Sequence, residues 1–386
     1  MSPELARNPR PTYATLRETT PVLRVDGVGV VVTSRSGVDE VLRNPDVFSS
    51  NMSAHDLKTE RPLIPLQIDP PAHRTYRRIL DPLFAPQRMQ ALEEPVARLV
   101  NDLIDGFIDD NEIDFAQQFS VPFPSRVFLT MFGLRPDELP TFLRMKDGVI
   151  RPDVVVGHEF GHPETDGYQQ RTADSIYAYF GRVLDERKDG GRDDLLSQVM
   201  RAEVDGDRLT REEILDICFL FLIAGLDTVT ASLDCFFGHL AQDPDGRRKL
   251  ADEPEAVPSV VEELLRWETP VMAVARVATC DAEVSGCPVE AGENVMAIIG
   301  AANVDGSEFP RAGELRWDRD ANRHLAFGGG IHRCLGSHLA RLELRIALRE
   351  WHSRIPDYCV KPGAELRYTA GIRTLESFPM LLHRTA

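Results

Sequence analysis

The feature that most constrains the fold is an apolar segment near the middle of the chain. Thr210 and Glu213 form a Thr-x-x-Glu capping box, which marks the first turn of a helix. We expect this helix to run from Arg211 to about Gln242, which is long for a globular protein. Residues 217–226 are almost all apolar, so we expect the helix to be buried all round. The sequence therefore predicts a large fold built around one central helix.

The composition is that of an ordinary globular protein, with 42% hydrophobic and 27% charged residues in a chain of 386. A formal net charge of -17 argues against nucleic-acid binding, because phosphate neutralisation needs clustered Lys and Arg. No run reaches the roughly 18 apolar residues of a membrane span. Residues 1–20 are polar and lack the apolar core of a signal peptide. We therefore expect a cytoplasmic protein without a membrane anchor.

The remaining pattern predicts a mainly α fold with small β-sheets. Asp26-Gly27 between β-branched runs predicts a hairpin over 22–32. A stretch of Pro, Gly, His and acidic residues over 151–167 indicates a mobile loop. Apolar spacing predicts helices over 36–42, 72–83, 86–111, 122–132, 136–150, 172–187, 258–269 and 337–355, and short strands over 276–279, 283–284 and 295–299. We expect one domain over 1–386, with a β-rich N-terminal region at about 20–70 and a helical core at about 71–386.

One cysteine needs an explanation of its own. The six cysteines include no Cys-x-x-Cys pair, so zinc sites and redox dithiols are disfavoured, and we expect most of them to be small buried side chains. Cys334 lies in the segment Phe-Gly-Gly-Gly-Ile-His-Arg-Cys-Leu-Gly, before a helix starting near Ser337. A thiolate there gains from the helix dipole. The alternatives are a glycine-rich turn with an incidental cysteine, or a nucleophile with His332 as its base.

The central helix contains residues that weaken helices. Gly225 and Asp227 both lower helix stability, and a buried carboxylate needs a partner. The Thr228 hydroxyl could simply bond a preceding carbonyl and bend the helix. Residues that lower helix stability inside an otherwise strong helix are also typical of a functional site.

These segments resemble motifs of the cytochrome P450 family. The cysteine segment is similar to its haem-binding loop, Phe-Gly-x-Gly-x-His-x-Cys-x-Gly, at every fixed position, and Ala-Gly-Leu-Asp-Thr at 224–228 resembles its oxygen-activation motif. The resemblance extends from Pro21 to Pro379. It implies a triangular helical domain that encloses haem between the long central helix and the cysteine loop. It makes Cys334 the iron ligand. Asp227 and Thr228 would be catalytic, and the other cofactor-binding residues in these motifs would be Gly225, Phe327, Gly328, His332 and Gly336.

Further positions match the family's pattern. Glu263 and Arg266 share one helix face, which by itself suggests only a surface ion pair. The resemblance implies that they are a buried structural pair completed by a further arginine. This arginine is Arg319 or Arg323, since residues 303–306 depart from the family's usual Asn-Arg-Asp-Pro and leave the register open. It also implies that the haem propionates are bound by His73, Arg77, Arg276 and His332.

The function that the resemblance implies is a haem-thiolate monooxygenase. It would use heme b, insert one oxygen atom from O2 into a hydrophobic small molecule, and take electrons from a ferredoxin and its reductase. The chain would be a monomer, and its ferredoxin would bind a basic patch made of Arg74, Arg78, Arg333, Arg341 and Arg345. The alternatives are a haem-thiolate binding or sensor protein, a non-redox isomerase or dehydratase, and a thiol hydrolase. The acid and the hydroxyl at 227–228 favour the monooxygenase.

Overall fold

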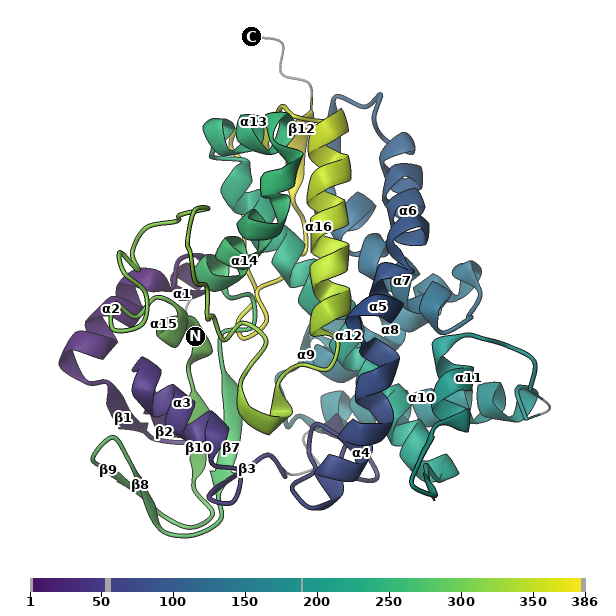
Figure 1. Cartoon of the computed structure of the whole chain (residues 1–386), viewed down its shortest axis with the longest axis vertical. Coiled ribbons are helices and arrows are strands. Elements are labelled where there is room, and N and C mark those ends of the chain that lie inside the picture. The colour runs from purple at the N-terminus through teal and green to yellow at the C-terminus, as the bar shows by residue number, and fades with distance from the viewer. Residues whose placement is uncertain (1–2, 53–56, 189, 383–386) are drawn as a thin grey trace. The chain divides into compact units, whose positions relative to one another are not determined.

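The computed structural model describes residues 3–52, 57–188 and 190–382 (Figure 1). The chain divides into two compact units, each described here by itself. The first contains the described parts of 1–49, 86–123 and 227–386, and the second those of 50–85 and 124–226. The second unit therefore interrupts the first twice along the chain.

A five-stranded sheet forms one side of the first unit, in the order β1, β2, β10, β7, β3. Its strands are β1 (Val22–Val25), β2 (Gly29–Val32), β3 (Phe48–Ser49), β7 (Val274–Ala278) and β10 (Asn294–Ala297). The predicted hairpin is confirmed, with β1 antiparallel to β2 and Gly27 at φ 75° in the turn. Val30, Val32 and Val295 are fully buried beside helix α3 (Arg35–Arg43), so the β-branched run builds this core.

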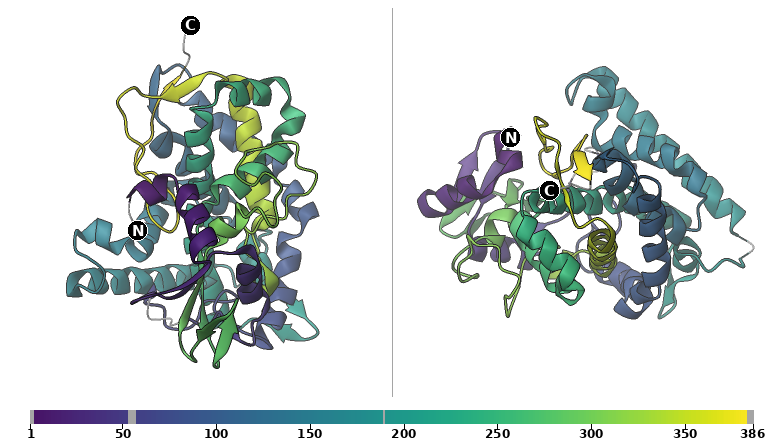
Figure 2. Two further views of the ribbon diagram at one scale, coloured as in Figure 1. Left: turned by 90° about the vertical axis from the view of Figure 1, so that its left-hand side faces the viewer. Right: turned by 90° about the horizontal axis from the view of Figure 1, so that it is seen from above.

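Helices and short strands make up the rest of the first unit. They are α1 (Pro3–Arg7), α2 (Arg10–Thr19), α5 (Pro86–Gln90), α6 (Glu93–Asp105), β4 (Glu112–Asp114), α13 (Pro244–Asp252), α14 (Val257–Glu268), β8 (Ala282–Val284), β9 (Cys287–Val289), α15 (Ile299–Asn303), α16 (Ser337–Arg354), β11 (Tyr358–Val360) and β12 (Pro379–Leu382). Helices α14 and α16 lie side by side (Figures 1 and 2). Trp351 on α16 packs in an aromatic cluster with Phe115, Phe119 and Phe237. This cluster anchors α16, whose first turn follows the cysteine loop.

In its described residues, the regular structure of the second unit is helical apart from one small hairpin. It contains α4 (Ala72–Leu80), α8 (Leu139–Ile150), α9 (Pro152–Val156), α10 (Pro163–Glu186), α11 (Leu195–Arg201), β5 (Glu203–Val204) and β6 (Asp207–Arg208), and α7 (Pro122–Met131) enters it from the first unit. The loop predicted over 151–167 is shorter than expected: α9 lies inside the predicted range and α10 begins at Pro163, so the connection covers only 157–162. Proline suits the first turn of a helix, and the periodicity was hidden because buried positions in the first turns carry polar residues, Thr165 and Gln169.

The central helix α12 runs from Arg211 to Leu240. Its capping box is confirmed: the Glu213 N–H donates to the Thr210 hydroxyl at 3.2 Å, and the Thr210 N–H donates to the Glu213 carboxylate at 2.7 Å. In the described chain it is the one helix long and apolar enough to cross a membrane, and 72% of its most apolar window is buried, as in a core helix. The prediction that α12 is buried all round is wrong at Ala224 and Gly225, which are exposed.

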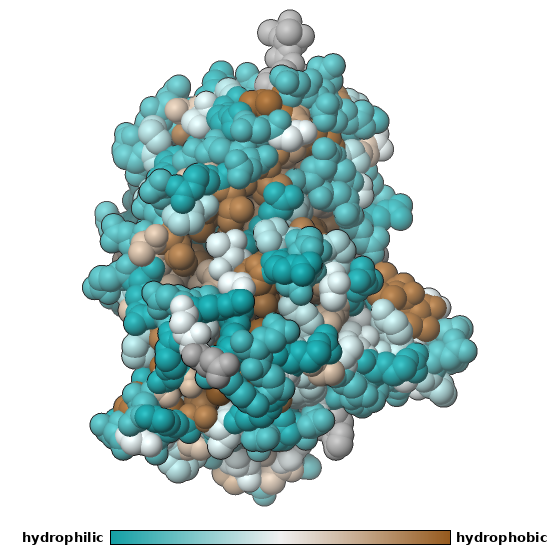
Figure 3. All heavy atoms as spheres, turned by 90° about the vertical axis from the view of Figure 1, so that its right-hand side faces the viewer, coloured by the Kyte–Doolittle hydropathy of each residue, from teal (hydrophilic) through white to brown (hydrophobic). Residues whose placement is uncertain are grey.

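The expectation that most cysteines are buried is wrong. Among the described cysteines, only Cys218 and Cys235 are buried, and Cys280 and Cys334 are exposed. Burial raises the pKa of both buried thiols, so they stay protonated and inert. The face drawn in Figure 3 is mostly hydrophilic with separate apolar patches, in keeping with the net charge of -17.

Candidate functional site

The cysteine loop is held in one shape by its own backbone. The Cys334 N–H donates to the Phe327 carbonyl at 2.8 Å, so the loop closes on itself. Gly328 and Gly330 have φ angles of 69° and 65°, which favour glycine. A Cβ on Gly330 would lie 2.1 Å from the carbonyl oxygen of Leu42 on α3. The glycines therefore let the loop turn and pack while the side chain of Cys334 stays exposed.

Cys334 lies just before the first residue of α16, Ser337. The Ser337 N–H donates to the Cys334 carbonyl at 3.4 Å, which ties the loop to the helix end. The positive end of the helix dipole favours a thiolate over a thiol at this position. The side chain is therefore both accessible and placed to carry negative charge.

A clamp that sequence reasoning missed lies against the first residue of this loop. The Arg341 guanidinium lies 4.3 Å from the centre of the Phe327 ring. Glu262 accepts two hydrogen bonds from Arg341, at 2.7 and 2.8 Å, and its carboxylate lies 3.1 Å from His324 Nε2. Burial opposes ionisation of Glu262, but hydrogen bonds from Arg341 and His324 lower its pKa to about 2. We call Glu262, His324 and Arg341 the proximal clamp.

The Glu263–Arg266 pair is buried, with both side chains at most 1% exposed. Two Arg266 nitrogens donate to the two Glu263 oxygens at 2.7 Å each. Arg319 completes the group with its Nε 2.9 Å from both Glu263 oxygens, whereas the Arg323 carbonyl accepts a hydrogen bond from Arg35. A surface ion pair is therefore excluded, and the choice between Arg319 and Arg323 falls on Arg319.

Arg276 belongs to the same unit as the cysteine loop. It lies on β7 with 8% of its surface exposed, and it donates to the Ala275 carbonyl at 2.7 Å. A cationic side chain that is nearly buried on a strand needs an anionic partner or a full set of acceptors. Arg276 and the residues of the cysteine loop are the expected cofactor contacts of the first unit.

The remaining expected residues belong to the second unit, except for Asp227 and Thr228. His73 on α4 is 2% exposed, and burial followed by the nearby Arg77 charge lowers its pKa. Arg77 forms an ion pair with Asp81 at 2.7 Å. Gly225 is exposed, and a Cβ there would meet only the Phe128 ring at 3.4 Å.

The acid and the hydroxyl of the central helix differ in exposure. Asp227 is 1% exposed and Thr228 is half-buried, and one buried residue separates them from the exposed pair Ala224 and Gly225. The Ser232 hydroxyl donates to the Thr228 carbonyl at 2.8 Å one turn further on. A short accessible stretch therefore lies in the mainly buried middle of the helix, two positions before a buried carboxylate.

The residues of the first unit fit a haem with a thiolate ligand. A single exposed sulfur at a helix start suits an iron with one axial protein ligand. Arg276 and His332 would provide basic groups for the two propionates. The glycines of the loop let a flat ligand approach the backbone.

Comparisons with known proteins identify the family. A cytochrome P450 family model matches residues 21–351. A mycinamicin IV hydroxylase/epoxidase of Micromonospora griseorubida is 32% identical over 93% of this chain and 91% of its own length. A steroid C26-monooxygenase of Mycobacterium tuberculosis is 32% identical over 97% and 94%. The crystal structure of CYP109E1 from Bacillus megaterium with corticosterone is 31% identical, with a TM-score of 0.87 and coverage of 98% and 99%.

The chain belongs to the cytochrome P450 family. It has the fold of that family, binds haem, and is a monooxygenase and therefore an oxidoreductase. The stand-alone thiol hydrolase is accordingly ruled out.

Proposed function

We propose that Cys334 binds the haem iron as a thiolate and that Phe327, Gly328, His332 and Gly336 shape the loop around it. The haem, once bound and reduced, supplies the activation of O2. The supporting observation is an exposed thiol in a glycine-shaped loop at the start of α16. The family match over 21–351 includes segments of both units, which supports one P450 domain over 1–386.

The carbon monoxide difference spectrum of the reduced protein tests this assignment. The unmodified protein should give the band typical of a thiolate ligand, and C334H should retain haem without that band. C280S changes another exposed cysteine and is the matched control. A thiolate band that survives in C334H would remove Cys334 from this role.

We infer that His73, Arg77, Arg276 and His332 bind the two propionates. Burial of His73 and Arg276 supports this, because a buried basic group is stable when a carboxylate neutralises it. His73 would bond a propionate oxygen through a ring N–H. R276L should then lose haem more readily than the unmodified protein during transfer to apomyoglobin.

We propose that Asp227 and Thr228 move protons toward the oxygen-activation site beside Gly225. Both follow the exposed stretch of α12, and the buried Asp227 is placed to pass a proton inward. T228A and D227N should release more hydrogen peroxide for each reducing equivalent consumed, with haem content unchanged. S232A, which changes a hydroxyl bonded within the same helix, is the control. Unchanged coupling in both variants would remove Asp227 and Thr228 from this role.

We propose a hydrophobic polycyclic or macrocyclic small molecule as the substrate. One relative is named for steroid oxidation and another for a mycinamicin, and a solved relative holds corticosterone. Titration with a panel of steroids and macrolides should displace the sixth ligand of the haem and change its absorption spectrum. The absence of any spectral response across both classes would contradict this substrate class.

We propose that electrons come from an acidic ferredoxin, supplied by its reductase, to a monomeric cytoplasmic enzyme. Two arginines of the expected basic patch are unsuitable for a test by charge reversal. Arg341 forms an ion pair with Glu262, and Arg78 forms one with Asp205, so reversing either charge would also break an ion pair. R345E is the cleaner test, because the Arg345 Nε bonds only a backbone carbonyl in the described contacts. It should slow reduction by ferredoxin and weaken its salt dependence. An unchanged rate would place the ferredoxin elsewhere.

A further inference from the structure

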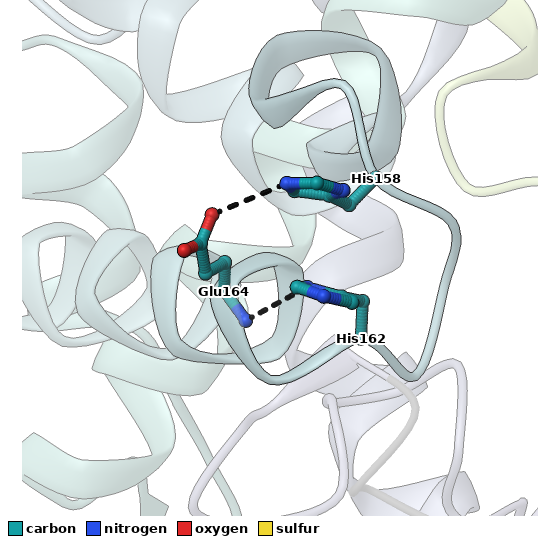
Figure 4. A group of neighbouring side chains, drawn as sticks. All are labelled: His158, His162 and Glu164. Atoms are coloured by element: carbon teal, nitrogen blue, oxygen red, sulfur yellow. Dashed lines mark hydrogen bonds and ion pairs between the residues drawn. The ribbon is translucent and has the colours of Figure 1, made fainter.

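Three metal-ligating side chains converge on the connection between α9 and α10, apart from the residues proposed for haem (Figure 4). His158 and His162 precede α10, and Glu164 lies in its first turn. One ligand atom from each residue lies within 4.8 Å of the others. The His158 Nε2 is 3.3 Å from a Glu164 carboxylate oxygen. All three residues belong to the second unit, so their geometry does not depend on the first.

Two glycines give this connection its shape. Gly157 and Gly161 have φ angles of 83° and 85°, which let the chain turn twice within a few residues. The turns bring the His158 and His162 rings to a centroid distance of 4.1 Å. The His162 Nδ1 accepts a hydrogen bond from the Glu164 N–H at 3.3 Å and so caps α10. Local sequence alone therefore assembles the group.

We propose that His158, His162 and Glu164 bind a divalent transition-metal ion of the zinc class. Two imidazole nitrogens and one carboxylate oxygen match the donors that zinc prefers, and water can complete four-coordination. Calcium and magnesium prefer all-oxygen ligands and fit this set poorly. Two histidines with a neighbouring carboxylate also hold together without metal through the His158–Glu164 ion pair.

Binding requires a small rearrangement that the exposed positions allow. The two rings are only 18° from parallel, so they must turn for both lone pairs to meet one ion. The side chains of His158 and Glu164 are 47% and 70% exposed, which leaves room for this. A metal ion bound to the Nδ1 of His162 occupies the lone pair that accepts the cap hydrogen bond. A metal ion bound to Nε2 leaves the ring proton on Nδ1, which then cannot accept that bond either. The metal therefore replaces a long hydrogen bond of 3.3 Å.

The ion would fix a segment that carries an exposed apolar side chain. Phe160 is 58% exposed and lies in sequence between the two histidines. A cavity of about 450 Å³ lies next to the site and shares Glu164 with it; its other lining residues are Val156, Pro163, Tyr168 and Arg171. Chelation would hold Phe160 and the mouth of this cavity in one arrangement.

Isothermal titration of the tag-free holoenzyme with zinc chloride tests the site. We expect one saturable zinc ion per chain, and at least about tenfold weaker binding in H158A and H162N. Asn retains a capping acceptor at position 162, so H162N removes the imidazole without removing the cap. E159Q changes a neighbouring exposed acid and should bind zinc as the unmodified protein does. Equal binding by all four proteins, or no stoichiometric uptake, would overturn the proposal.

Hydrogen exchange provides a readout that does not depend on the haem. Amides over 157–162 should exchange more slowly when zinc is present, in the unmodified protein and E159Q but not in H158A. Excess magnesium should leave this protection unchanged. Zinc binding without slower exchange over 157–162 would place the ion at other histidines and refute the assignment.

Discussion

The proximal clamp should contribute measurably to stability through the charge of Glu262. Burial opposes that charge, yet hydrogen bonds from Arg341 and His324 lower the pKa from 4.5 to about 2. One pKa unit corresponds to about 1.4 kcal/mol, so the ionised form gains at most about 3.4 kcal/mol. Because 30% of the Glu262 side chain is exposed, solvent screening reduces this gain. We expect E262Q to lower the free energy of unfolding by about 2 kcal/mol near neutral pH.

The pH dependence follows from the direction of this shift. A lowered carboxyl pKa contributes its full stability above the unfolded value of 4.5 and loses it as the pH falls through about 2. The difference between E262Q and the unmodified protein should therefore shrink across that window. Reversible urea unfolding measures it, with haem content matched between samples.

Two controls make this prediction specific to the clamp. E255Q changes an exposed glutamate and should shift unfolding by less than about 0.5 kcal/mol. The carbon monoxide spectrum of E262Q should also change, because Arg341 is then less firmly held over the Phe327 ring. Equal urea midpoints for E262Q, E255Q and the unmodified protein at neutral pH would refute the reasoning.

Three further substitutions test other parts of the fold. E263Q should cost about 3–5 kcal/mol, because it leaves the buried guanidinium beside it without a full charge partner, and it should reduce the yield of folded holoprotein. G330A should cost at least about 2 kcal/mol in thermal unfolding, since its Cβ would meet the Leu42 carbonyl, whereas G306A, with open space around it, should be near neutral. T210A should cost about 1 kcal/mol in urea unfolding through loss of the cap of α12, and an unchanged midpoint would contradict that role.

Short-range patterns predicted their elements well. The Asp26-Gly27 hairpin and the capping box of α12 depend on residues within one turn of each other, and both are confirmed. The start of α10 was missed because its first turns are polar and carry no apolar period. Pro163 after His162 was the available signal, since proline favours the first turn of a helix.

Long-range pairings were less accessible to sequence reasoning. Glu262 meets Arg341 across 79 positions, and nothing in the local spacing of either residue indicates the other. The Glu262-Glu263 doublet was the one hint, because adjacent residues on a helix point in different directions and so serve different partners. Exposure of Ala224 and Gly225 was hidden for a related reason: burial depends on what packs against a helix, and periodicity cannot report that.

The sequence by itself determined the family, the haem and the chemistry expected of Cys334, because motif residues lie within a few positions of one another and backbone geometry places them. Only the tertiary structure decided that Arg319 completes the Glu263–Arg266 group and that Glu262 holds Arg341 against Phe327. These contacts join segments that are distant in the sequence and are brought together by burial of the core. Burial depends on apolar residues along the whole chain, so the local sequence around each contact does not predict it.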